Sequence, residues 1–189
     1  MNKNFIFLNS FINISEGTFE KLQKISSFKV VEPNTPVARA GEIASKIYLL
    51  VSGIMRVYLR DESGKEYNKN FFMPLSFVGS YTSIIQNEPA KLTYETMTEC
   101  KLYEIDFKAI IELCKKDLEI SNLYNKILEK IFISYEERQL ELISLDAKQR
   151  YLRLRARFPD IDSLIPQYQI ASYLSITPVQ LSRIRKTLN

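Results

Sequence analysis

The sequence predicts an α+β protein: an N-terminal antiparallel β-roll, or jelly roll, followed by a long helix and a C-terminal helix-turn-helix of winged-helix-like type. Three observations predict this class. Alternating β-branched and aromatic residues, broken by turn signals, fill residues 28–105. An apolar repeat of helical spacing then runs through most of residues 118–158. Residues 164–189 contain two short helical patterns separated by a tight turn.

The N-terminal segment, residues 2–25, predicts one or two short helices. Ser15 is a candidate N-cap for the second, and Phe19, Leu22 and Ile25 have the spacing of its buried face. The apolar patch at residues 5–8 is soon interrupted by polar residues, so we expect neither a signal peptide nor a membrane-spanning segment. This favours a cytoplasmic protein without a membrane partner.

Seven or so short strands are expected next. Their spacing of roughly 8–12 residues is typical of a sandwich or jelly roll. Pro33 and Pro36 indicate a turn, and residues 61–64 close a hairpin. The expected strands are residues 28–31, 46–51, 54–60, 65–72, 75–78, 93–98 and 101–105.

A long helix is expected after a shorter one that Asp106 caps and that runs through Cys114. Six of its residues follow one another at intervals of 3, 4, 3, 4 and 3, the a/d pattern of a coiled coil. This stripe could pack on the β domain or pair with a second copy; we favour a dimer, because helix-turn-helix proteins generally bind DNA in pairs. The predicted seam consists of Leu128, Ile131, Tyr135, Arg138, Leu142 and Leu145.

Another helix is predicted after Ser144 and Asp146, which are both cap candidates. Its apolar face consists of Ala147, Tyr151, Leu154 and Phe158, and Pro159 stops it. The arginines at 150, 153 and 157 point away from that face.

The last two helices are expected at residues 166–174 and 177–188. Thr177 and Gln180 form a capping box, with Pro178 at the first helical position between them. Ser175 lies in the turn, where glycine is usual because the backbone needs a positive φ, at a cost of roughly 1 kcal/mol. The pattern also fits a helical hairpin that covers a core, but the cap, the spacing and the polar outer face together favour DNA binding.

The polar outer face supplies the candidate DNA contacts. Arg183 is the best candidate for a bidentate contact with guanine, Gln180 could read adenine, and Val179 could contact a thymine methyl group. The others are expected to contact phosphates or to position the helix. The full set is Gln167, Tyr168, Thr177, Pro178, Val179, Gln180, Ser182, Arg183 and Lys186.

Charge and composition support this interpretation. Residues 144–189 carry eight Lys and Arg against three Asp, a net charge of +5, whereas the rest of the 189-residue chain has 18 basic and 19 acidic residues, a net charge of −1. The chain has no histidine and two cysteines, Cys100 and Cys114. This excludes His-based catalytic triads, zinc fingers, four-cysteine iron–sulfur clusters and His-ligated haem, so no metal site and no catalytic residues are expected.

The order of these modules resembles that of the Crp/Fnr superfamily of bacterial transcription regulators, over nearly the whole chain. The resemblance implies a homodimer, two reading helices in successive major grooves of a palindromic duplex, RNA polymerase as a partner and an effector in the β-roll. It divides the chain into a sensor at 1–116, a dimerisation helix at 117–145 and a DNA-binding domain at 146–189. Its motifs are Gly41-Glu42, residues 48–53, 61–66, 77–79 and 100–105 in the β domain, and Ile170-Ala171 and residues 176–184 in the DNA domain.

The effector pocket departs from that of the relatives that bind cyclic AMP. Those relatives have Gly-Glu before a short helix and Arg-Ser a little later. Here Ser80 follows Gly79, and Lys91 alone supplies a positive charge without the fork of arginine. The sequence therefore argues against cyclic AMP, and the effector stays unidentified. The candidate pocket consists of Gly79, Ser80, Tyr81, Lys91 and Thr93.

Two other functions compete with a transcription regulator. One is a cyclic-nucleotide-binding signalling module whose C-terminal helices dock a protein instead of DNA. The other is a cupin-like enzyme, which usually needs two or three histidines around a metal and finds none here. We therefore expect no enzyme activity and no cofactor.

Overall fold

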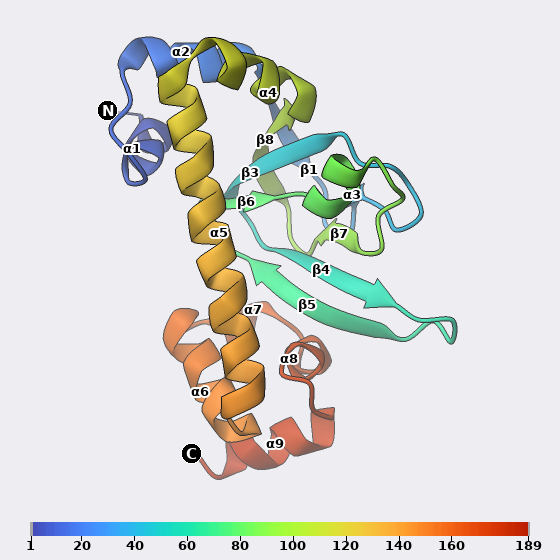
Figure 1. Ribbon diagram of the computed structural model, residues 1–189. Helices are drawn as coiled ribbons and strands as arrows, with labels where there is room; N and C mark the ends of the chain where they lie inside the picture. Colours follow the sequence, from blue (N-terminus) through green and yellow to red (C-terminus); the bar gives the residue numbers. More distant parts are fainter. Residues whose placement is uncertain (1, 189) are drawn as a thin grey trace.

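Two four-stranded antiparallel sheets form the β-roll (Figure 1). The computed structural model describes residues 2–188. The sheets have strand orders β1-β8-β3-β6 and β2-β7-β4-β5, and the core between them includes Leu50, Met55 and Leu102. The strands are β1 (Ser26–Val31), β2 (Pro36–Ala38), β3 (Lys46–Ser52), β4 (Met55–Arg60), β5 (Glu66–Phe72), β6 (Ser76–Val78), β7 (Thr93–Thr96) and β8 (Cys100–Asp106).

Two glycines permit the tight connections around β4. In the predicted β4–β5 hairpin, Gly64 has φ 83°, and Asp61 Oδ1 accepts hydrogen bonds from the backbone N–H of Ser63 (2.9 Å) and Lys65 (3.0 Å). Between β3 and β4, Gly53 has φ 92°, and a Cβ there would clash with the carbonyl of Glu99. The hairpin turn sets the register of β4 against β5, the two strands that later meet the C-terminal helices.

A second core joins the N-terminal helices to the β-roll. The helices α1 (Lys3–Asn9), α2 (Glu16–Lys24) and α4 (Phe107–Lys116) bury Leu22 and Ile110 against the start of α5 (Leu118–Ser144). The predicted caps are confirmed: Ser15 Oγ accepts from the N–H of Thr18 at 3.1 Å, and Asp106 Oδ1 accepts from that of Ala109 at 3.2 Å.

The long helix α5 extends from this N-terminal core, past the β-roll, to the C-terminal helices (Figure 1). It contains 27 residues. Asp117 caps it by accepting from the N–H of Glu119 at 3.0 Å, and the same carboxylate pairs with Lys21 Nζ at 2.6 Å. The predicted long helix is confirmed, and its N-terminal end is held in place.

The C-terminal helices share a core with the β-roll. They are α6 (Ala147–Arg157), α7 (Ile161–Leu164), α8 (Gln167–Tyr173) and α9 (Pro178–Lys186). The buried cluster that contains Tyr151, Ile170 and Leu181 also includes Ile54 and Phe71, which come from the β3–β4 connection and from β5. The helix-turn-helix therefore packs directly on the sensor domain.

Several details differ from the sequence prediction. β2, α3 (Tyr81–Gln86) and α7 were not predicted, because three to six residues are too few for a periodic signal. Ser144 ends α5, and Asp146 alone caps α6, in a capping box with Gln149. Within residues 2–188 no strand follows Asp106, so the predicted wing is not present there. No helix of the described chain is long and apolar enough to cross a membrane.

Candidate nucleic-acid interface

The turn between α8 and α9 is a Schellman motif. Ser175 has φ 57°, as predicted, and its N–H donates to the carbonyl of Ser172 at 3.1 Å. The N–H of Ile176 donates to the carbonyl of Ala171, also at 3.1 Å. These two bonds satisfy the last carbonyls of α8 and turn the chain into α9, although a non-glycine residue must adopt the left-handed conformation.

The predicted capping box at the start of α9 is confirmed, and it changes the expected role of Gln180. The N–H of Gln180 donates to Thr177 Oγ1 at 3.2 Å, and Gln180 Oε1 accepts from the N–H of Thr177 at 2.8 Å. A bidentate contact with adenine needs both the amide oxygen and the amide nitrogen of glutamine. Since the oxygen already belongs to the cap, Gln180 can offer only its nitrogen while the cap is intact.

The two sides of α9 differ sharply in exposure. Leu181 is fully buried, whereas Val179 on the outer side is 60% exposed. Arg183 and Lys186 are exposed as well, and within residues 2–188 neither forms an ion pair. The helix therefore presents an apolar contact and two unneutralised cations to the solvent, which is the chemistry needed to meet base edges and phosphates.

The remaining predicted contact residues lie around this face. Gln167 Nε2 donates to the carbonyl of Pro178 at 3.3 Å, so it connects the start of α8 to the start of α9. Tyr168 is 60% exposed, and Ser182 is half-buried. The structure thus brings the predicted DNA-contact residues together on α8 and α9.

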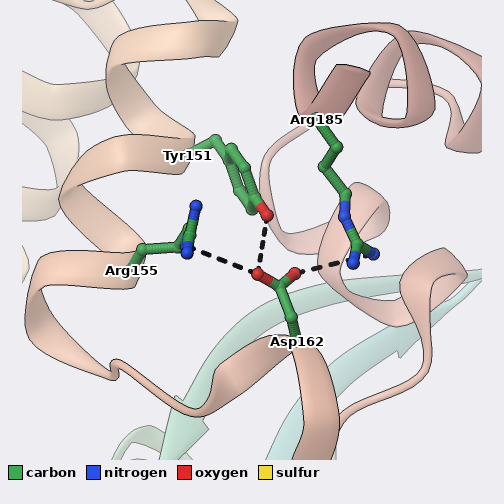
Figure 2. Close-up of a pocket in the computed structure, with 4 residues that line it drawn as sticks. All are labelled: Tyr151, Arg155, Asp162 and Arg185. Carbon is green, nitrogen blue, oxygen red and sulfur yellow. Dashed lines mark hydrogen bonds and ion pairs between the residues drawn. The ribbon is translucent and has the colours of Figure 1, made fainter. Parts of the chain in front are cut away.

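A carboxylate that the sequence reasoning missed joins three of the C-terminal helices. Figure 2 shows Asp162 of α7 facing Tyr151 and Arg155 of α6 and Arg185 of α9. The Tyr151 hydroxyl donates to Asp162 Oδ2 at 2.7 Å, and Arg155 Nε and Arg185 Nη1 lie 3.5 and 3.7 Å from its oxygens. Burial, and then the hydrogen bond to Asp162, raise the pKa of Tyr151 to about 12, so the phenol remains the donor at neutral pH.

The hollow lined by these four residues has a volume of about 70 Å³. The carboxylate of Asp162 lies between the two arginines, so it connects α7, on which it stands, to α6 and α9. The side chains of Arg155 and Arg185 are 43% and 38% exposed, so each ion pair is partly screened by water.

The candidate effector residues do not all face one space. Tyr81 packs edge-on against Phe107 at 5.6 Å, in the N-terminal helical core outside the β-roll, whereas Thr93 begins β7 of the second sheet. Ser80 is buried, and Lys91 is exposed. A Cβ at Gly79 would lie 3.3 Å from the carbonyl oxygen of residue 46, so the backbone is closely packed there. None of the five lines the hollow of about 120 Å³ beside β2 and β3, whose lining includes Arg39 and Tyr48.

Tyr94 lies beside Ser80, and Tyr135 of α5 lies near Tyr94. Burial first, and then the neighbouring Tyr135 of α5, raise the pKa of Tyr94, and a hydrogen bond with Ser80 opposes this shift. Tyr94 also stacks on Phe72 with ring centroids 6.3 Å apart, and Lys69 Nζ lies 4.7 Å from the Tyr135 ring centroid. Ser80 therefore lies next to the buried Tyr94, which is itself packed against other aromatic side chains of the protein.

On α5, one residue of the predicted dimer seam has a partner within the same protomer. Arg138 Nη2 donates to the carbonyl of Tyr173 at 2.5 Å, and its guanidinium lies 3.9 Å from the centroid of that ring. This part of the predicted seam is therefore used within the protomer, but against α8 and not, as the alternative interpretation expected, against the β domain. The apolar side chains that α5 exposes most in its C-terminal half lie on another face; they are Phe132 (70%), Ile133 (53%), Leu140 (58%) and Ile143 (82%).

Comparisons with known proteins agree with this architecture. Residues 28–117 match the family model of the cyclic nucleotide-binding domain. CRP-like protein Clp of Xanthomonas euvesicatoria is 23% identical over 171 residues, which cover 90% of this chain and 74% of Clp. Clp of Xanthomonas oryzae is 26% identical over 147 residues, which cover 74% of this chain and 63% of that relative.

Solved structures share the fold. The structure of CLP from Xanthomonas campestris, described as a c-di-GMP-responsive global regulator, superposes with a TM-score of 0.71 at 20% identity, covering 92% of this chain and 91% of that one. A Eubacterium rectale protein assigned to transcriptional regulators of the crp/fnr family gives a TM-score of 0.70 at 14% identity, covering 92% and 83%. At these identities the likeness establishes the arrangement of β-roll, long helix and C-terminal helices.

Proposed function

We propose that this chain, which fits the Crp/Fnr superfamily of transcription regulators, is a dimeric, sequence-specific DNA-binding regulator that reads its operator with α9. One observation carries the proposal. The helix buries Leu181 against the protein and leaves Val179, Arg183 and Lys186 in solvent, so a cationic face stands ready for a duplex. The net charge of +5 over residues 144–189 places the attraction for phosphates in the same region.

The contacts divide by chemistry. Arg183 would donate to the O6 and N7 of a guanine, and Val179 would pack against a thymine methyl group. Gln180 would donate one hydrogen bond from its nitrogen, because its oxygen serves the cap. The other residues would contact phosphates and set the position of the helix. These are Gln167, Tyr168, Thr177, Pro178, Ser182 and Lys186.

A second copy would pack on the exposed apolar face of α5. Phe132, Leu140 and Ile143 follow one another at intervals of eight and three residues, so they lie along one side of the helix. Pairing two such faces would bury them and place two copies of α9 in successive major grooves. The operator should then have two-fold symmetry, with half-sites about 10–10.5 base pairs apart. RNA polymerase would be a partner of this protein at the promoters that such operators control.

The residues of the β-roll argue against cyclic AMP as the effector. The ribose-binding carboxylate is replaced by Ser80, which is buried beside Tyr94, and Lys91 is exposed. We propose that the effector is another small molecule, and the c-di-GMP response of CLP makes cyclic dinucleotides the first to test. A bound effector raises the melting temperature by mass action, so titration should give no shift with cyclic AMP.

The test of DNA binding is selection of duplexes from a random pool at low ionic strength, followed by titration of the enriched sequence. The expected result is a palindrome that the protein binds with an affinity about 10³-fold or more above that for random DNA. A protein that retains no duplex in this experiment, with or without cell extract, would contradict the proposal.

Two matched variants of α5 test which of its faces forms the dimer interface. Ile143→Asp introduces a charge on the exposed face, and Leu142→Asp introduces one on the neighbouring predicted seam. Sedimentation should show a monomer for Ile143→Asp and a dimer for Leu142→Asp, because a buried unpaired carboxylate costs several kcal/mol. The reverse pattern would restore the seam predicted from the sequence.

A further inference from the structure

The contact between the sensor domain and the helix-turn-helix contains a buried polar network. Figure 1 shows α8 beside β5, and the residues that meet there include Gln169 and Asn68, each 6% exposed, and Arg56, 8% exposed. A contact of purely apolar side chains can slide at small cost, whereas hydrogen bonds between buried groups are satisfied in only one arrangement. This network therefore defines how α8 sits on the β-roll.

Arg56 of β4 is the centre of the network. Its Nε and Nη2 donate to Glu95 Oε2 at 3.2 and 2.8 Å, and its Nη1 donates to Glu66 Oε2 at 2.6 Å. The same Nη1 donates to Gln169 Oε1 of α8 at 3.0 Å. The guanidinium thus joins two carboxylates of the sensor domain to one amide of the DNA-binding unit, 113 residues along the chain.

Further bonds repeat the connection. Asn68 Nδ2 donates to the carbonyl of Gln169 at 3.0 Å and also to its side-chain oxygen. The N–H of Asn68 donates to Ser172 Oγ at 2.9 Å, and that hydroxyl donates to the carbonyl of Glu66 at 3.2 Å. Since Glu66 and Asn68 lie in β5 and Ser172 lies in α8, strand and helix are connected at two points one helical turn apart.

The C-terminal end of α8 is held by the long helix. Arg138 of α5 donates to the carbonyl of Tyr173, the last residue of α8, and stacks on its ring. Tyr173 also packs against Phe71 of β5 with ring centroids 5.2 Å apart. In the arrangement held by these contacts, the outer face of α9 remains uncovered.

We propose that Arg56 and Gln169 are positioning residues for DNA recognition. They contact no base; through α8 and its turn they fix the direction of α9 relative to the β-roll and to α5. In a dimer joined along α5, this direction sets the distance and angle between the two reading helices. The inference rests on the proposed function, and it assigns to a sensor-domain residue the geometry of the DNA-binding pair.

The test uses two conservative variants and a control. Gln169→Met preserves the volume and leaves Arg56 with both carboxylates, whereas Arg56→Lys preserves the charge and loses the fork that reaches Gln169. Arg60→Lys is the matched control, because Arg60 also donates to Glu66 but is exposed and forms no hydrogen bond or ion pair with α8 within residues 2–188.

Each protein is titrated with the selected palindrome, with versions lengthened or shortened by one base pair between the half-sites, and with a single half-site. Gln169→Met and Arg56→Lys should each lose roughly 10-fold or more in affinity for the native spacing, because a hydrogen bond to a charged group is lost. Their preference for the native over the altered spacings should shrink, with half-site binding within about 2-fold of wild type. Arg60→Lys should retain both the affinity and the spacing preference.

General damage to the DNA-binding unit would lower half-site and full-site binding together, and that result would overturn the proposal. Wild-type affinity and spacing preference in both variants would overturn it equally. A thermal-unfolding cycle of Arg56→Lys, Gln169→Met and the double variant tests the contact without DNA. Non-additive losses are expected, and additive losses would reject the coupling. If the wild-type protein binds no DNA, the proposed function fails, while this cycle still decides whether the two residues are coupled.

Discussion

The two helices of the helix-turn-helix have opposite relations to the rest of the protein. In α8, four of seven residues are buried, among them Gln169 and Ile170, and they contact the β-roll and α5. In α9, only Leu181 of nine residues is buried, and the outer face remains in solvent. The side chains of α8 pack against the rest of the protein and hold this helix in place. The outer side chains of α9 are exposed instead and are available to a ligand.

The largest effect expected from this difference is on stability. Ile170→Ala should lower the free energy of unfolding by about 2–5 kcal/mol, because Ile170 is fully buried and the variant leaves a cavity. Val179→Ala on α9, 60% exposed, should change it by less than about 0.5 kcal/mol. Urea denaturation of both variants measures the contrast, and equal losses would refute the distinction between the helices.

Binding should show the reverse contrast. Arg183→Ala should weaken operator binding by about 1–3 kcal/mol and relax the preference at one base pair in each half-site. Its melting temperature should match that of wild type, since Arg183 is exposed and forms no ion pair within residues 2–188. Titration with operators substituted at each position gives the answer, and a variant that discriminates as well as wild type would remove Arg183 as the base reader.

The turn between the helices offers a smaller, stabilising change. Ser175→Gly should raise the free energy of unfolding by about 1 kcal/mol, because glycine adopts the observed φ of 57° without the steric penalty of a side chain. Operator affinity should be unchanged, because Ser175 is not one of the predicted DNA-contact residues. Chemical denaturation would show a lower midpoint instead if the serine side chain stabilises the turn.

The smallest effect tests whether Lys186, on the outer face of α9, contacts a phosphate. Lys186→Ala should reduce the slope of log affinity against log salt concentration by about 0.9 per protomer, the value for one lost phosphate contact. The affinity should fall alike for all sequences. A change confined to the selected operator would mean that Lys186 contacts a base.

Local chemistry made much of this unit predictable from the sequence. Thr177 and Gln180 form their capping box because both partners lie within four residues of each other. The positive φ at Ser175 follows from the short distance between two helical patterns. In the same way, the caps at Ser15 and Asp106 depend on near neighbours in the chain.

The contacts between distant segments could not be predicted in this way. Intervals of three and four residues fit more than one face of α5, and only the position of Tyr173 shows that Arg138 is used within the protomer. Nothing in the sequence pairs Arg56 with Gln169, or Asp162 with Arg185, because hydrogen-bonding side chains have no periodic pattern. Short elements such as α3 and α7 were missed for a related reason, since they contain too few turns to repeat.

The length of α5 has a mechanical consequence. Its 27 residues extend for about 40 Å at 1.5 Å per residue, with Asp117 anchored at one end and Arg138 holding Tyr173 near the other. A tilt of about 5° around the anchored end would displace the far end by roughly 3.5 Å over that length. This is close to the rise of about 3.4 Å between neighbouring base pairs. A tilt of only about 5° would therefore move the far end of α5, beside the helix-turn-helix, by about one step of the duplex.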